Sequence, residues 1–67
     1  MKENLYQFVD KMIQSHFTVS ETLELVEKVY IEKMLNRHNQ NVSATAKTMQ
    51  VHRNTLMRKI KSLGIRE

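Results

Sequence analysis

Apolar residues recur at helical spacing through most of the chain, and polar stretches divide the pattern into four segments. In the first segment, near residues 2–15, apolar side chains fall three or four positions apart with charged residues between them. Its members are Leu5, Phe8, Val9, Met12, Ile13 and Phe17. Because the chain has no proline and a single glycine, its sequence does not interrupt a helix here. The segment predicts an amphipathic helix.

A helix-start signal at Thr18 opens the second segment. Glu21 follows three residues later, which is the spacing of a capping box, and Ser20 is an alternative N-cap. An apolar stripe then runs to about His38. It contains Leu23, Val26, Val29, Tyr30, Met34 and Leu35, while Leu25 and Ile31 lie outside it and widen the apolar face. A second helix of about 18 residues is therefore predicted.

The apolar face of this second helix is too wide for one short chain to cover. A domain of about this size buries only about 60% of the surface that its unfolded chain exposes, so it gains from association. Pairing residues 1–38 with those of a second copy, as a four-helix bundle, would cover the face, and we favour this homodimer. In the alternative, the C-terminal helices fold back and cover all of it.

The last 27 residues before the C-terminal dipeptide, 39–65, have the pattern of a helix-turn-helix. After a polar break, Asn41 or Ser43 can cap a short helix that is predicted from Ser43 to Thr48. The tight stretch 49–51 follows, and a fourth helix then begins with His52 as its N-cap.

The fourth helix is predicted to end at Gly64, the glycine that can supply a left-handed C-cap residue. Ile65 then lies where it can contact Ile60. Seven apolar residues can pack the third and fourth helices against each other: Val42, Ala46, Met49, Val51, Leu56, Ile60 and Leu63.

Polar residues of the fourth helix are suited to contact with nucleic acid. With Leu56 and Ile60 turned inward, the rotation of 100° per residue turns Asn54, Arg58 and Lys61 outward. Arginine can bind guanine and asparagine adenine through two hydrogen bonds each, and a threonine methyl can meet a thymine methyl. Arg53, in the first turn, and Thr55 add to this set. Lys59 and Lys61 are expected to contact phosphates, as are the free N–H groups beside Asn41 and Ser43.

Charge is concentrated on the same segment. The net charge of the chain is +4. Residues 1–38 hold five basic and six acidic residues, for a net charge of −1, whereas residues 39–67 hold six basic residues and one acidic residue, for +5. This asymmetry indicates a polyanionic partner. The alternative is a solvated basic surface without a partner.

The stretch NVSATAKTMQVHRNTLMRKIKSLGI resembles the C-terminal helix-turn-helix of the Fis family, a module that also closes NtrC-type activators. The resemblance covers about residues 20–65 and includes Val26–Ile31, which is similar to the dimer helix of that family. It implies an intertwined dimer that presents two recognition helices to adjacent major grooves. It assigns base or phosphate contacts to Asn41, Ser43, His52, Arg53, Thr55, Arg58 and Lys59. Gln50 replaces the family's turn glycine, and Met57 replaces a basic or aromatic residue.

Other classes of function find little support in the sequence. The three histidines lack metal-ligand spacing and there is no cysteine, so we expect neither a metal nor another cofactor. No nucleophile–base pair indicates an enzyme or a small-molecule substrate. Neither a membrane span nor a signal peptide is evident, so a cytoplasmic, nucleoid-associated protein with no membrane partner is expected.

The sequence thus predicts an all-α, single-domain fold with two dimerisation helices in residues 1–38 and a Fis-like helix-turn-helix in residues 39–67. We expect a bacterial transcription regulator that binds double-stranded DNA as a homodimer with sequence preference. A nucleoid-type protein that bends DNA is one alternative, and a helical protein-interaction module is another. RNA is disfavoured because all four aromatic residues lie in the N-terminal half, away from the basic face.

Overall fold

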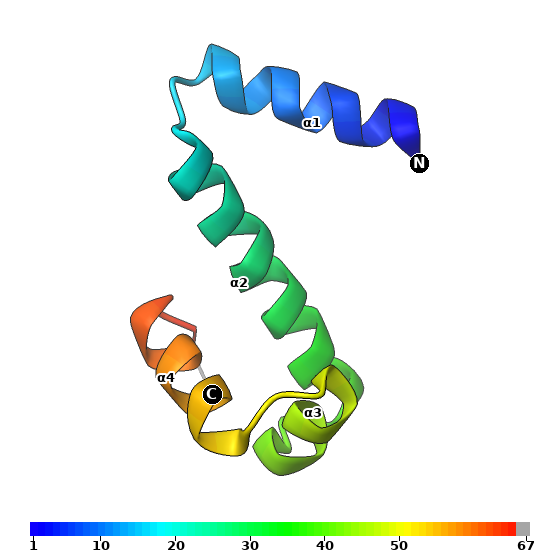
Figure 1. Cartoon of the computed structure of the whole chain (residues 1–67). Helices are drawn as coiled ribbons and strands as arrows, with labels where there is room; N and C mark the ends of the chain where they lie inside the picture. Colours follow the sequence, from blue (N-terminus) through cyan, green and yellow to red (C-terminus); the bar gives the residue numbers. More distant parts are fainter. Residues whose placement is uncertain (66–67) are drawn as a thin grey trace.

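The computed structural model describes residues 1–65, which form four helices and no strand. The helices are α1 (Lys2–Gln14), α2 (Val19–Arg37), α3 (Val42–Met49) and α4 (Arg53–Ser62), so the predicted all-α class is confirmed. Helix α1 lies across the N-terminal end of α2, whereas α3 and α4 lie at its other end (Figure 1). Arg66 and Glu67, which the charge count included, lie outside the described residues.

The start of α2 has the predicted capping box. Thr18 Oγ1 accepts a hydrogen bond from the backbone N–H of Glu21 at 3.1 Å, and Glu21 Oε1 accepts one from the backbone N–H of Thr18 at 2.9 Å. The pKa of Glu21 is held below its ordinary value first by the backbone N–H of Thr18, which donates to the carboxylate, and then by the Thr18 side chain, because both favour the charged form. Ser20, the alternative cap, lies within the helix.

All four helices end in the same way, with a left-handed residue just after the last turn. At each end, one backbone N–H bonds five residues back and the N–H before it bonds three residues back, as in a Schellman motif. The left-handed residues are His16, Asn39, Gln50 and Gly64, with φ of 63°, 55°, 58° and 69°. Gly64 therefore has its predicted role. Gln50 takes the left-handed conformation without being glycine, at a cost of about 1 kcal/mol.

A small core joins α2, α3 and α4. Its buried apolar residues are Ile31, Leu35, Ala46, Leu56, Ile60 and Ile65, and Val42, Met49, Val51, Met57 and Leu63 pack around them. The predicted packing of α3 against α4 is confirmed, including the burial of Ile65 beside Ile60. The predicted apolar stripe of α2 was partly wrong. Ile31, which was expected outside the stripe, is buried in this core together with Leu35 of the stripe. The apolar side chains of α3 and α4 bury α2 only at Ile31 and Leu35, so only the C-terminal half of α2 contributes to the core.

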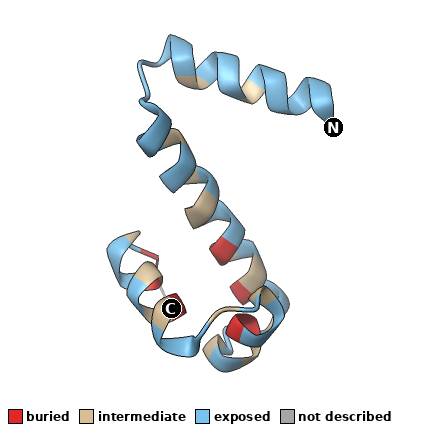
Figure 2. Ribbon diagram, viewed as in Figure 1, coloured by how far each residue is buried: buried red, intermediate tan, exposed pale blue. Residues whose placement is uncertain are grey.

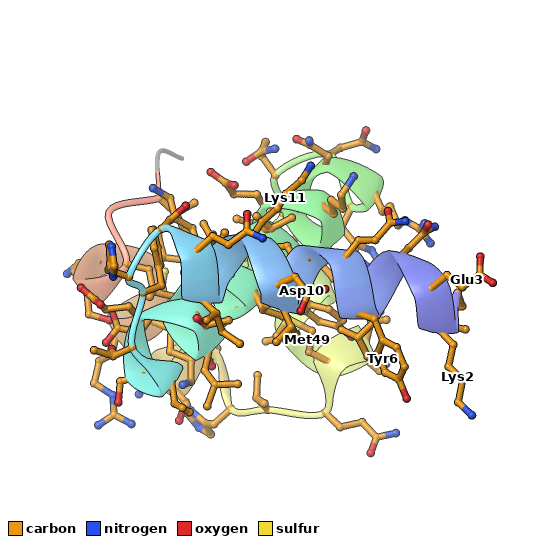
Figure 3. The ribbon with its side chains drawn as sticks, turned by 90° about the horizontal axis from the view of Figure 1, so that it is seen from above. Lys2, Glu3, Tyr6, Asp10, Lys11 and Met49 are labelled. Carbon is orange, nitrogen blue, oxygen red and sulfur yellow. The ribbon has the colours of Figure 1, made fainter. Side chains whose placement is uncertain are left out.

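Residues 1–30 include no buried residue (Figure 2). The large apolar side chains that remain exposed all lie between positions 1 and 30: Met1, Leu5, Tyr6, Val9, Ile13, Phe17, Val19, Leu23, Val26, Val29 and Tyr30. Figure 3 shows Lys2 and Glu3 extending from the first turn of α1, away from the rest of the molecule. The alternative in which the C-terminal helices cover the whole face of α2 is therefore wrong.

Candidate nucleic-acid interface

The N-termini of α3 and α4 are both capped by exposed polar side chains. Asn41 Oδ1 accepts a hydrogen bond from the N–H of Ala44 at 2.9 Å, which makes Asn41, rather than Ser43, the N-cap of α3. His52 Nδ1 accepts a hydrogen bond from the N–H of Asn54 at 3.0 Å, as an N-cap of α4. Because Nδ1 accepts in this bond, the neutral ring carries its proton on Nε2, where it can donate to a ligand.

A hydrogen bond between Arg53 and Ser43 brings these two helix starts together. Arg53 Nε donates to Ser43 Oγ at 3.0 Å, and both side chains are exposed. Four of the predicted site residues, Asn41, Ser43, His52 and Arg53, therefore lie along one edge of the domain. Because Ser43 engages only Nε, the two terminal nitrogens of the guanidinium can form a fork toward a ligand.

The outward face of α4, which we define as Asn54, Arg58 and Lys61, is exposed as the sequence predicts. Leu56 and Ile60, on the opposite side of the helix, are 0% and 1% exposed. Arg58 Nη2 donates to Thr55 Oγ1 at 3.2 Å, so the half-buried Thr55 orients one cation of this face. The result is a helix that displays two cations and an amide in one row.

Lys59 lies apart from the rest of the predicted site. Its ammonium forms an ion pair of 2.8 Å with Glu27 of α2. Glu27 was not among the residues that the sequence indicated. The sequence did contain a signal that Lys59 faces α2. Lys59 follows Leu56, a predicted inward residue, by three positions, which places the two side chains within about 60° of each other around the helix.

Thr45 is a second residue that sequence reasoning missed. It is fully buried, and its hydroxyl donates to the backbone carbonyl of Asn41 at 2.8 Å. This bond satisfies a buried polar group and ties the first turn of α3 to its N-cap. Thr45 therefore supports the cap residue rather than facing a ligand.

A comparison with protein families identifies the region that contains this interface. The model for "Bacterial regulatory protein, Fis family" matches residues 22–63, which include most of α2 and all of α3 and α4. No curated protein and no solved structure gave a significant match. Among residues 1–65, no helix is both long and apolar enough to cross a membrane. The matched segment contains every residue of the candidate interface and leaves α1 outside.

Proposed function

The chain belongs to the Fis family of bacterial regulatory proteins, and from that premise we propose that it binds duplex DNA as a sequence-preferring homodimer. The observation that carries the proposal is the outward face of α4, displayed by a helix whose other side is buried in the core. The net charge of +5 on residues 39–67 supports the same partner, because a basic segment attracts the phosphate backbone.

In this proposal α4 is the recognition helix and enters the major groove. Arg58, held by Thr55, and Arg53, held by Ser43, present guanidinium groups that can bind guanine O6 and N7. Asn54 can bind adenine through its amide. Lys61, a flexible cation at the far end of the helix, is suited to a phosphate instead.

The edge formed by the starts of α3 and α4 is the proposed phosphate contact. The first N–H groups of a helix point out of its end and carry a partial positive charge, which favours an anion. Asn41, Ser43 and His52 add side-chain donors beside them. These contacts would fix the register of α4 in the groove without reading sequence.

Residues 1–38 are proposed to form the dimer interface. Helix α1 has 13 residues and buries none of them within one chain. An isolated helix of this length is marginal in water, so a partner surface is needed to stabilise it. Two apolar grooves of about 270 and 320 Å³ lie along α1 and α2, lined by residues such as Phe8, Ile13, Phe17, Leu23 and Val26. A second copy offers the matching apolar surface.

The resemblance to NtrC-type activators supports a role as the DNA-binding domain of a bacterial transcription regulator that acts at the nucleoid. A domain of this kind works through binding alone, without a catalytic step. The ratio of specific to non-specific affinity distinguishes it from an architectural DNA-bending protein, for which the ratio is much smaller.

The test is duplex binding by fluorescence anisotropy at two salt concentrations. Wild type is expected to bind non-specific duplex with a dissociation constant on the order of micromolar at low salt and to weaken steeply as salt is added. Arg53→Ala and Arg58→Ala should each weaken binding to a preferred site by about 10-fold or more. Lys11→Ala, which removes one charge from α1, is the matched control and should change binding little.

Two results would contradict the proposal. If wild type does not bind duplex at low salt, the DNA-binding role is wrong, and an interaction module is the better interpretation. If both arginine variants bind as tightly as Lys11→Ala, the assignment of α4 as the recognition helix is wrong.

A further inference from the structure

The ion pair between Glu27 and Lys59 joins the helix proposed to dimerise to the helix proposed to read DNA. The Glu27 Oε2 to Lys59 Nζ distance is 2.8 Å, and the side chains are 41% and 40% exposed. It is the one salt bridge among residues 1–65. An ion pair this exposed adds little to folding stability, so stability alone is a weak reason for its presence.

The pair changes the charge that α4 offers to DNA. The helix contains four cations, Arg53, Arg58, Lys59 and Lys61, and Glu27 neutralises one of them. Lys59 lies on the side of α4 next to α2, about 100° around the helix from Arg58 of the outward face. Its flexible stem and part-exposed ammonium would allow it to reach a backbone phosphate if the carboxylate released it.

We propose that Glu27 competes with DNA phosphate for Lys59 and so lowers the affinity of α4 for duplex DNA. A carboxylate and a phosphate offer an ammonium the same kind of anionic oxygen, so Lys59 can satisfy only one of them fully. With the carboxylate already at 2.8 Å, Lys59 stays with Glu27 and contributes no phosphate contact. This inference rests on the proposed DNA-binding function and names the residue that limits it.

The experiment compares Glu27→Gln with Glu24→Gln. Both variants remove one negative charge from α2, but Glu24 is exposed and forms no salt bridge with any described residue. Glu27→Gln would add one phosphate contact in each protomer, so the bound dimer gains two; together they change the slope of log affinity against log salt by about −1.8, which corresponds to about 25- to 100-fold tighter binding near 0.1 M. We therefore expect Glu27→Gln to bind duplex that much more tightly than Glu24→Gln, with the steeper slope. Circular dichroism confirms that each variant is folded.

The same change is then made in a Lys59→Met background, where the gain should disappear because no ammonium remains to be released. Lys59→Met alone supplies a measurement that does not depend on the Glu27 variant. It should leave the salt slope of wild type unchanged, whereas Lys61→Met should reduce the slope by about 2, one contact from each protomer of the dimer.

Three outcomes overturn the inference while wild type still binds DNA. They are equal affinities for Glu27→Gln and Glu24→Gln, a gain that persists without Lys59, and a salt slope that falls by about 2 in Lys59→Met. Failure of wild type to bind at low salt is a different result, because it removes the proposed function on which the inference rests.

Discussion

Residues 1–30 and residues 31–65 use their apolar side chains in opposite ways. Every buried residue lies at position 31 or later, and every large apolar side chain that stays exposed lies at position 30 or earlier. The boundary falls inside α2, so one continuous helix serves both regions. Its C-terminal half packs on α3 and α4, whereas its N-terminal half and α1 leave their apolar faces uncovered.

This comparison shows that the same amphipathic pattern can serve two purposes. In the C-terminal region, three helices contribute apolar residues to one core, and the polar faces are free for a ligand. In the N-terminal region, two helices offer apolar faces that one chain cannot cover, which indicates a second copy. The C-terminal region can therefore hold its structure from within, whereas the N-terminal region depends on association.

Truncating the centre of the C-terminal core is the largest expected perturbation. Leu56→Ala, at a position that is 0% exposed, should lower the free energy of unfolding by about 2–5 kcal/mol through lost burial and a cavity. The loss should appear at every protein concentration in urea unfolding followed by circular dichroism. Lys61→Ala on the outward face of α4 is the control and should unfold like wild type. A loss below about 1 kcal/mol for Leu56→Ala would show that this core does not hold the region together.

A charge introduced on the exposed face of α2 tests whether the N-terminal region depends on association. Leu23 is 62% exposed in one chain, so Leu23→Glu should be tolerated by the monomer but should place an unpaired carboxylate in the dimer interface. We expect the dimer dissociation constant to rise by about 100-fold or more, measured by sedimentation equilibrium. Gln7→Glu, on the polar face of α1, adds the same charge and should leave the dimer intact. A monomeric wild type would contradict the interpretation of this region.

A substitution at Gln50, the left-handed residue between α3 and α4, should have a smaller effect on stability. Gln50 has φ of 58° and an exposed side chain, so Gln50→Gly relieves backbone strain without removing a packed group. The free energy of unfolding should rise by up to about 0.6 kcal/mol, because the relief of about 1 kcal/mol of strain is partly offset by the greater entropy of glycine in the unfolded chain. Lys47→Gly, inside α3, should instead lower it by about 1 kcal/mol. Destabilisation by Gln50→Gly would contradict the left-handed turn.

The smallest effect is the pH dependence of the α2 capping box. Because its hydrogen bonds lower the pKa of Glu21 in the folded chain, the charged carboxylate favours folding above the ordinary glutamate pKa of about 4.3. That contribution is lost as the pH falls through the lower pKa of the folded state. Glu21→Gln keeps an acceptor oxygen but does not titrate, so its melting temperature should fall less than that of wild type between pH 6 and 3. Equal decreases would show that the capping box does not contribute to the acid response.

Local signals were sufficient to predict most of the fold. The capping box at Thr18, the N-cap at His52 and the left-handed Gly64 depend on residues close together in sequence, so their identities decide the geometry. The choice of Asn41 over Ser43 was open, because both residue types can cap a helix. The helix begins at Val42, so Asn41 is the N-cap, and Ser43, inside the first turn, instead accepts a hydrogen bond from Arg53, ten residues away.

The sequence by itself determined the four helices, the apolar packing of α3 on α4 and the outward row of Asn54, Arg58 and Lys61, since helical periodicity fixes which side chains share a face. Only the tertiary structure decided how the wide apolar face of α2 is divided, because that depends on how far α3 and α4 reach along it. Ile31 and Leu35 became core for that reason. The same packing turned Lys59 toward Glu27, a contact across 32 positions that no local pattern encodes.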